Sequence, residues 1–313
     1  MNYFQVFVKI LILIIFLLGS ASWAEDSNRR TPIVKAVEKI GASVVNINTE
    51  EAAPAVRNPF RDSRNPFFDQ FFKEFFPRLN NNRRSLGSGV IIHPEGYILT
   101  NEHVVAKATS IKVTLIDKRE FDARLVGADI KSDLAVIKIE TKDNLPHVDL
   151  GRSDDLMIGE TVIAIGNPFG LQHTVTTGII SALHRSIKGG KNRVYRGFIQ
   201  LDASINPGNS GGPLLNINGS LIGINTAIFK QAEGIGFAIP INKAKRIIND
   251  LIRYGKVRRG WLGVSVQGMT KEMLRFFHID RIRGVVVTQV MEGSPGARAG
   301  LKRGDVILSL ENN

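Results

Sequence analysis

Asp202-Ala-Ser-Ile-Asn-Pro-Gly-Asn-Ser-Gly-Gly-Pro-Leu214 is the stretch on which the interpretation of the whole chain depends. At its centre, Gly208-Asn209-Ser210 is followed by two more glycines, which permit a tight turn and the close approach of another molecule. The backbone N–H groups of Gly208 and Ser210 could converge beside the serine hydroxyl as an oxyanion hole, the usual companion of a serine nucleophile. The same residues also suit a plain turn between two strand-like segments, Phe198–Leu201 and Leu214–Ile217, so the rest of the chain must decide.

The composition is typical of a globular protein, and the first residues differ from the rest of the chain. The chain is 43% hydrophobic, and its 313 residues are enough for one large or two modest domains. Residues 1–24 hold a single charge, Lys9, before the apolar run Ile10–Leu18, which predicts a signal peptide cut after Ala24. An uncleaved inner-membrane anchor is the alternative; after cleavage we expect no membrane span. The chain has no cysteine, which excludes disulfides, zinc–thiolate sites and a cysteine nucleophile and suits a bacterial periplasm.

The net charge of +12 raises the question of an anionic partner. The basic residues are dispersed, with small clusters at Arg83-Arg84, Lys188–Arg196 and Arg253–Arg259, and no nucleic-acid-binding motif accompanies them. We therefore expect a solvated basic surface and no nucleic-acid partner.

Short strand-like segments separated by turn residues dominate the chain up to Ile239, which predicts an all-β fold. Two groups of strands, before and after about Leu145, suit two small barrels. The first group is Val44–Ile47, Gly87–His93, Tyr97–Thr100, Ile111–Ile116, Phe121–Val126 and Leu134–Ile139; the second is Thr161–Gly166, Thr174–His184, Phe198–Leu201, Leu214–Ile217, Leu221–Ala227 and Gly236–Ile239. Apolar residues at helical spacing predict helices over Thr31–Ile40 and Asn242–Tyr254.

A long insertion, residues 50–84, interrupts the first group of strands. Within it, Asn65–Phe76 carries six phenylalanines in three pairs. Because the segment is polar, it cannot bury these phenylalanines by itself. We therefore expect them to pack on the body of the protein, on a partner subunit or on a membrane surface.

A serine nucleophile needs a base, and the base needs an orienting acid. His103 follows a strand in Ile98-Leu-Thr-Asn-Glu-His-Val-Val105. Asp133 sits where a loop enters the apolar strand Leu134–Ile139 and can point its carboxylate inward. Either residue alone would be taken as structural, but their order, His103, Asp133, Ser210, favours a catalytic triad.

This order and its motifs resemble the HtrA (Deg) family of exported, DegP/Do-like serine endopeptidases. The matching stretches are Gly87-Ser-Gly-Val-Ile-Ile, Thr100-Asn-Glu-His-Val-Val, Lys131-Ser-Asp-Leu-Ala-Val-Ile-Lys, Ala164-Ile-Gly-Asn-Pro-Phe-Gly, Asn206-Pro-Gly-Asn-Ser-Gly-Gly-Pro-Leu and Ile235-Gly-Phe-Ala-Ile-Pro240. They are collinear from about Ile33 to Lys256. The resemblance implies a trypsin-like protease domain over 25–256, a double six-stranded β-barrel.

The resemblance also implies roles for individual residues. Ser210 would attack the substrate carbonyl, His103 would carry the proton and Asp133 would orient the imidazole, with Gly208, Asn209 and Ser210 forming the oxyanion loop. Substrate would bind along Thr226, Ala227 and Ile228, with Ile205 and Ile228 bordering a small apolar pocket; alternatively, both isoleucines are simply core.

The last stretch, 257–313, resembles the beginning of the PDZ domain found in this family. Trp261, Leu262, Gly263 and Val264 match the carboxylate-binding loop. Gly284–Val290, Ser294–Leu301 and Gly304–Leu308 continue the match. We expect a partial PDZ domain (α+β) with exposed strand edges.

The sequence thus predicts an exported, periplasmic serine endopeptidase that degrades unfolded or damaged proteins without a metal or organic cofactor. By resemblance it forms homotrimers or higher homo-oligomers. A chaperone-like holdase and a peptide-sensing module with low proteolytic activity are the alternatives.

Overall fold

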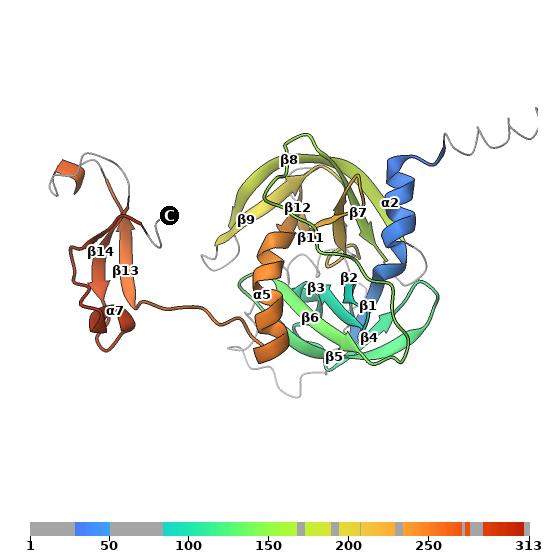
Figure 1. The fold of residues 1–313 in the computed structure, drawn as a ribbon, viewed down its shortest axis with the longest axis horizontal. Helices are drawn as coiled ribbons and strands as arrows, with labels where there is room; N and C mark the ends of the chain where they lie inside the picture. The colour runs from blue at the N-terminus through green and yellow to red at the C-terminus, as the bar shows by residue number, and fades with distance from the viewer. Residues whose placement is uncertain are drawn as a thin grey trace, which may run out of the picture. The chain divides into compact units, whose positions relative to one another are not determined.

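The structure, a computed structural model, describes residues 29–50, 84–167, 173–188, 194–206, 208–228, 234–270, 273–275 and 284–309. The expected signal peptide and the phenylalanine-rich Asn65–Phe76 lie outside these residues. The chain forms two compact units, one extending to Val257 and one beginning at Arg258 (Figure 1).

Two closed antiparallel barrels of six strands make up the first unit, which confirms the expected fold. The N-terminal barrel has the order β1-β2-β3-β6-β5-β4, and the C-terminal barrel has the order β10-β11-β12-β9-β8-β7 (Figure 1). The strands are β1 (Val44–Glu50), β2 (Arg84–His93), β3 (Tyr97–Thr100), β4 (Ser110–Thr114), β5 (Glu120–Asp129), β6 (Leu134–Ile139), β7 (Thr161–Gly166), β8 (Thr174–Lys188), β9 (Val194–Leu201), β10 (Pro213–Asn216), β11 (Leu221–Ile228) and β12 (Gly236–Pro240).

The side-chain alternation of the strands explains why two barrels form and then pack together. All six residues of β6 are buried. Leu134 and Val136 belong to one hydrophobic cluster, whereas Ala135 and Ile137 belong to another. Successive side chains of a strand point to opposite faces, so β6 fills its own barrel with one face and contacts a second cluster with the other.

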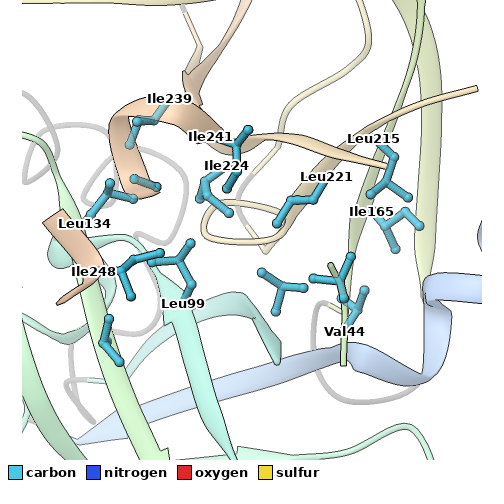
Figure 2. Close-up of a cluster of buried hydrophobic side chains, with 14 of the residues drawn as sticks. Val44, Leu99, Leu134, Ile165, Leu215, Leu221, Ile224, Ile239, Ile241 and Ile248 are labelled. Atoms are coloured by element: carbon cyan, nitrogen blue, oxygen red, sulfur yellow. The ribbon is translucent and has the colours of Figure 1, made fainter. Parts of the chain in front are cut away.

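The second cluster contains residues of both barrels and of helix α5 (Ile241–Tyr254). Figure 2 shows these side chains gathered together, among them Val44 and Leu99 of the N-terminal barrel and Ile165 and Leu215 of the C-terminal barrel. This shared core fixes the position of one barrel against the other, and with it any site built at their junction.

One helix precedes the twelve strands of this unit in the sequence, and another follows them. Helix α2 (Pro32–Ile40) begins at the N-cap Thr31, whose hydroxyl accepts from the backbone N–H of Val34. Helix α5 ends at Gly255, which adopts a left-handed conformation that glycine tolerates best. Both match the expected helices to within one residue.

The second unit contains the three-stranded sheet β13-β14-β15. Its strands are β13 (Val264–Gly268), β14 (Val285–Val290) and β15 (Val306–Ile307), and the short helix α7 (Pro295–Arg298) precedes β15. Among the described residues of either unit, no helix combines the length and apolar character that crossing a bilayer requires.

Candidate active site

His103 and Asp133 come from separate turns of the N-terminal barrel and meet as a buried pair. His103 lies in the single-turn helix α4 (Glu102–Val105), which is anchored by Val104 and Val105 in the barrel core. Its Nδ1 lies 2.8 Å from both carboxylate oxygens of Asp133, and its backbone N–H donates to Oδ1 at 3.1 Å. The two side chains are 3% and 0% exposed. This contact fixes the orientation of the imidazole.

The backbone of Asp133 adopts a conformation that few non-glycine residues take, with a φ of +55°. The amide Nδ2 of Asn101, two residues before His103, donates to the Asp133 carbonyl at 3.0 Å. In the same loop, the carboxylate of Asp129 accepts from the backbone N–H of Ser132 at 2.9 Å. These bonds hold the turn in the shape that brings its carboxylate to His103.

Ser210 lies in the turn between β9 and β10 of the C-terminal barrel and is fully buried. Its hydroxyl donates to the carbonyl of Thr226 at 3.4 Å, a long hydrogen bond. The hydroxyl of Thr226 in turn donates to Oδ2 of Asp133 at 2.6 Å. Thr226 therefore contacts both the serine and the carboxylate that holds the histidine, and it joins the two barrels at the site.

The serine turn leaves two of its backbone N–H groups without an acceptor among the described residues. The N–H of Asn209 donates to Asn206, that of Gly211 to Asn225, and that of Gly212 to the Asn209 carbonyl. Within the described part of the chain, those of Gly208 and Ser210 donate to no acceptor of the protein. These are the two donors expected for an oxyanion hole.

Asn209 therefore contributes to the predicted oxyanion loop through its side chain rather than through its N–H. Its amide Nδ2 donates to the carbonyl of Ser204 at 3.1 Å, and its Oδ1 accepts from the N–H of Asn206 at 3.0 Å. These bonds brace the residues that lead into the turn.

The residues expected to bind substrate lie around this turn. Ile205 is 2% exposed and belongs to the core of the C-terminal barrel, beside Gly236, where an added Cβ would lie 2.7 Å from Ile205. Thr226 lies on β11, at a point where the pairing of β11 with β12 is irregular. The backbone of Ala227 and Ile228 belongs to the same strand, β11. The side chains of Ala227 and Ile228 lie outside what the structure describes.

The predicted carboxylate loop of the second unit packs against α7. Leu262 accepts from the N–H of Gly296 and Gly263 from that of Met291, both at 2.8 Å. Gly263 has a φ of +71°, and a Cβ there would lie 2.2 Å from Ser294. Trp261 is exposed, and Val264 begins β13. Position 263 therefore requires glycine, because of both its backbone conformation and the lack of space for a Cβ.

Sequence reasoning did not identify Asn101 or the hydroxyl of Thr226 as supports of the histidine–aspartate pair. Asn101 stands inside the Thr100-Asn-Glu-His-Val-Val motif, and Thr226 was expected only to bind substrate. No sequence signal distinguishes their buried hydrogen bonds to a residue 32 or 93 positions away.

Comparison with known proteins agrees with this fold. The family model of the trypsin-like peptidase domain matches residues 87–224, and that of the PDZ domain matches residues 251–313. A probable periplasmic serine endoprotease, DegP-like, from Hahella chejuensis is 47% identical over 88% of this chain, and one from Pseudomonas putida (strain W619) is 43% identical over 99%. The chain spans 60% and 66% of these relatives.

A solved structure of the HtrA-type protease AlgW with a tripeptide superimposes with a TM-score of 0.72. It is 44% identical in sequence, and the match covers 90% of this chain and 83% of that protein. Such identity over most of both chains is far above what a shared barrel architecture alone would require. With its trypsin-like barrels and its PDZ segment, the chain belongs to the HtrA family of serine proteases.

Proposed function

We propose that this protein is a serine endopeptidase that cleaves unfolded or damaged polypeptides through an acyl-enzyme. The observation that carries the proposal is the position of Thr226, which accepts from Ser210 and donates to Asp133. Since Asp133 also holds the imidazole of His103, one continuous set of contacts includes all three candidate catalytic residues.

In the proposed reaction the Ser210 hydroxyl attacks the carbonyl carbon of the scissile peptide while His103 takes its proton. Asp133 keeps the imidazole in one orientation and stabilises its charged form. The oxyanion that forms accepts hydrogen bonds from the backbone N–H groups of Gly208 and Ser210. His103 then returns the proton to the leaving amine, and water releases the acyl group in a second, equivalent step.

The energetic contributions are unequal. Removing one oxyanion donor typically costs about 10²- to 10³-fold in kcat, whereas removing the nucleophile abolishes nearly all of the chemical acceleration because the triad acts as a unit. Ser210→Ala should therefore be as damaging as loss of all three residues.

The relatives named above are described as periplasmic, which supports the proposal that this chain is exported and acts in the periplasm. We propose the protease domain over 25–256 and the PDZ segment over 257–313. Ile205, Thr226, Ala227 and Ile228 are proposed to bind substrate, and Trp261, Leu262, Gly263 and Val264 to form the carboxylate loop. The proposed assembly is a homotrimer or a multiple of it.

The test is degradation of reduced, permanently unfolded casein by the wild-type chain and by Ser210→Ala, with Ser43→Ala as matched control. Ser43 is also a buried serine, but its hydroxyl donates to Ile40, within the α2 segment. We expect cleavage by the wild type and by Ser43→Ala and none by Ser210→Ala. A folded wild-type protein that suppresses casein aggregation without cutting it would favour the holdase alternative instead.

A further inference from the structure

The motif Gly87-Ser-Gly-Val-Ile-Ile has no role in the mechanism above, although its serine lies against the turn that carries Ser210. Ser88 is on β2 of the N-terminal barrel and is fully buried. Its backbone N–H donates to the carbonyl of Ser210 at 2.9 Å, and its hydroxyl donates to the carbonyl of Gly208 at 2.5 Å. One residue thus holds two carbonyls of the serine turn from the opposite barrel.

The remaining polar groups of Ser88 are also occupied. Its hydroxyl oxygen accepts the N–H of Asn167, after β7, at 2.8 Å. Its carbonyl accepts the hydroxyl of Thr100 at 2.7 Å. Thr100 immediately precedes Asn101, which holds Asp133. Ser88 therefore links the serine turn to the segment that leads into the histidine helix.

Neighbouring glycines give β2 the space to make these contacts. A Cβ on Gly87 would lie 2.8 Å from Val104 and 3.3 Å from the Ser210 carbonyl. A Cβ on Gly211 would lie 2.2 Å from the Ser88 carbonyl. Side chains at either position would push the strand and the turn apart, so the glycines and Ser88 act together.

We propose that Ser88 is a positioning residue for the oxyanion hole, which it shapes by holding the carbonyls of Gly208 and Ser210 toward β2. Peptide units are planar, so each held carbonyl fixes the orientation of its peptide unit. Gly208 has a φ of +108°, and because it lacks a Cβ its backbone can rotate more freely than that of its non-glycine neighbours. Two fixed peptides, on either side of the Asn209–Ser210 peptide, restrain the N–H of Ser210 and limit rotation at Gly208.

This inference rests on the proposed serine-protease function, because it assigns Ser88 a role in transition-state stabilisation. Ser88 itself would not touch substrate. Its removal should therefore lower kcat and leave KM nearly unchanged, since the ground-state contacts of the substrate remain. Loss of a whole oxyanion donor costs about 10²- to 10³-fold, so misplacement of such donors in Ser88→Ala should cost about 10- to 100-fold in kcat.

The experiment compares Ser88→Ala with Ser43→Ala for peptide cleavage and for inhibition by a peptide boronate, which forms a tetrahedral adduct on a catalytic serine. Both variants lose the hydrogen-bonding hydroxyl of a buried serine: Ser88 lies on β2, and Ser43 lies in the short 3-10 turn just before β1. We expect Ser88→Ala to lose kcat and boronate affinity by the same factor, with KM within about twofold, a pattern that marks a transition-state effect. Ser43→Ala should keep wild-type kcat.

Several outcomes would overturn the proposal. One is a wild-type kcat for folded Ser88→Ala, and another is an equal loss in both serine variants. If Ser88→Ala does not fold, Ser88→Cys keeps the size of the group and a weaker donor, and its kcat must lie below that of the wild type. Failure of the wild-type chain itself to cleave peptide or bind boronate would instead refute the proposed protease function.

Discussion

Replacement of Thr226 by valine tests how the site is held together. The change keeps the shape of the side chain and removes the hydroxyl that donates to Oδ2 of Asp133 at 2.6 Å. Both residues are fully buried, so water cannot replace the lost donor without a rearrangement. Asp133 keeps its contacts with the ring and backbone N–H of His103.

A hydrogen bond to a charged group contributes about 1.5–3 kcal/mol, and about 1.4 kcal/mol corresponds to a factor of ten in rate. If Thr226→Val misplaces the carboxylate in the transition state, kcat/KM should therefore fall by roughly 10- to 100-fold. Unfolding in urea should show a loss of stability of about 1–3 kcal/mol, because a buried carboxylate loses one partner.

The assay is peptide hydrolysis at 25 °C with the fraction folded measured on the same sample. Thr226→Ser is the matched control, since it keeps the hydroxyl and loses only a methyl group, and it should retain kcat/KM within about threefold. A folded Thr226→Val with the same kcat/KM as Thr226→Ser would refute the reasoning that this hydroxyl orients the carboxylate of Asp133.

Three further changes test other parts of the structure. Burial lowers the pKa of His173, so its imidazole binds a proton less readily in the folded chain than in the unfolded chain. The free energy of unfolding should therefore fall as the pH drops below about 6.5, and it should level off below the pKa of the folded state. His173→Gln should remove this part of the pH dependence of the free energy of unfolding, measured by urea titration. If that free energy changes with pH between 5 and 7 as steeply as in the wild type, the pH dependence does not come from His173. Gly211→Ala, at a φ of +84° and with no room for a Cβ beside Ser88, should abolish cleavage or prevent folding, and a fully active variant would show that the turn is looser than described. Leu251→Ala, in the core between α5 and the barrels, should lower the free energy of unfolding by about 2–5 kcal/mol. Ile252→Ala, at an exposed neighbouring position, should lower it much less, and equal losses would count against the shared core.

The strands were predictable because the physics that selects them is local. Short, mostly apolar segments bounded by turn residues predicted β6 and β7 to the residue, and the division near Leu145 predicted the two barrels. The end of β8 was missed: the strand continues past His184 to Lys188, and its pairing with β9 shifts register three times between Ile180 and Ile187. The expected strand Leu214–Ile217 lies one residue earlier, at Pro213–Asn216. Tertiary pairing decides such ends, and a single sequence does not display it.

The candidate site shows the same division. His103, Asp133 and Ser210 were selected by residue type, order and resemblance, and the structure places Asp133 against His103. The left-handed backbone of Asp133 could not be predicted, because only a few per cent of non-glycine residues adopt that conformation. The contact between Ser88 and Gly208 joins residues 120 positions apart, and it depends on two barrels that exist only after folding.

The most direct test of the central claim is covalent labelling of the folded chain with a fluorophosphonate, followed by peptide mass spectrometry to locate the adduct. Such probes react with a serine only when a neighbouring base and an oxyanion hole activate it. We predict one adduct, on Ser210, that disappears in His103→Ala and is retained in Ser43→Ala. A folded wild-type chain that carries no adduct, or carries it on another serine, would contradict the assignment of Ser210, His103 and Asp133 as a catalytic triad.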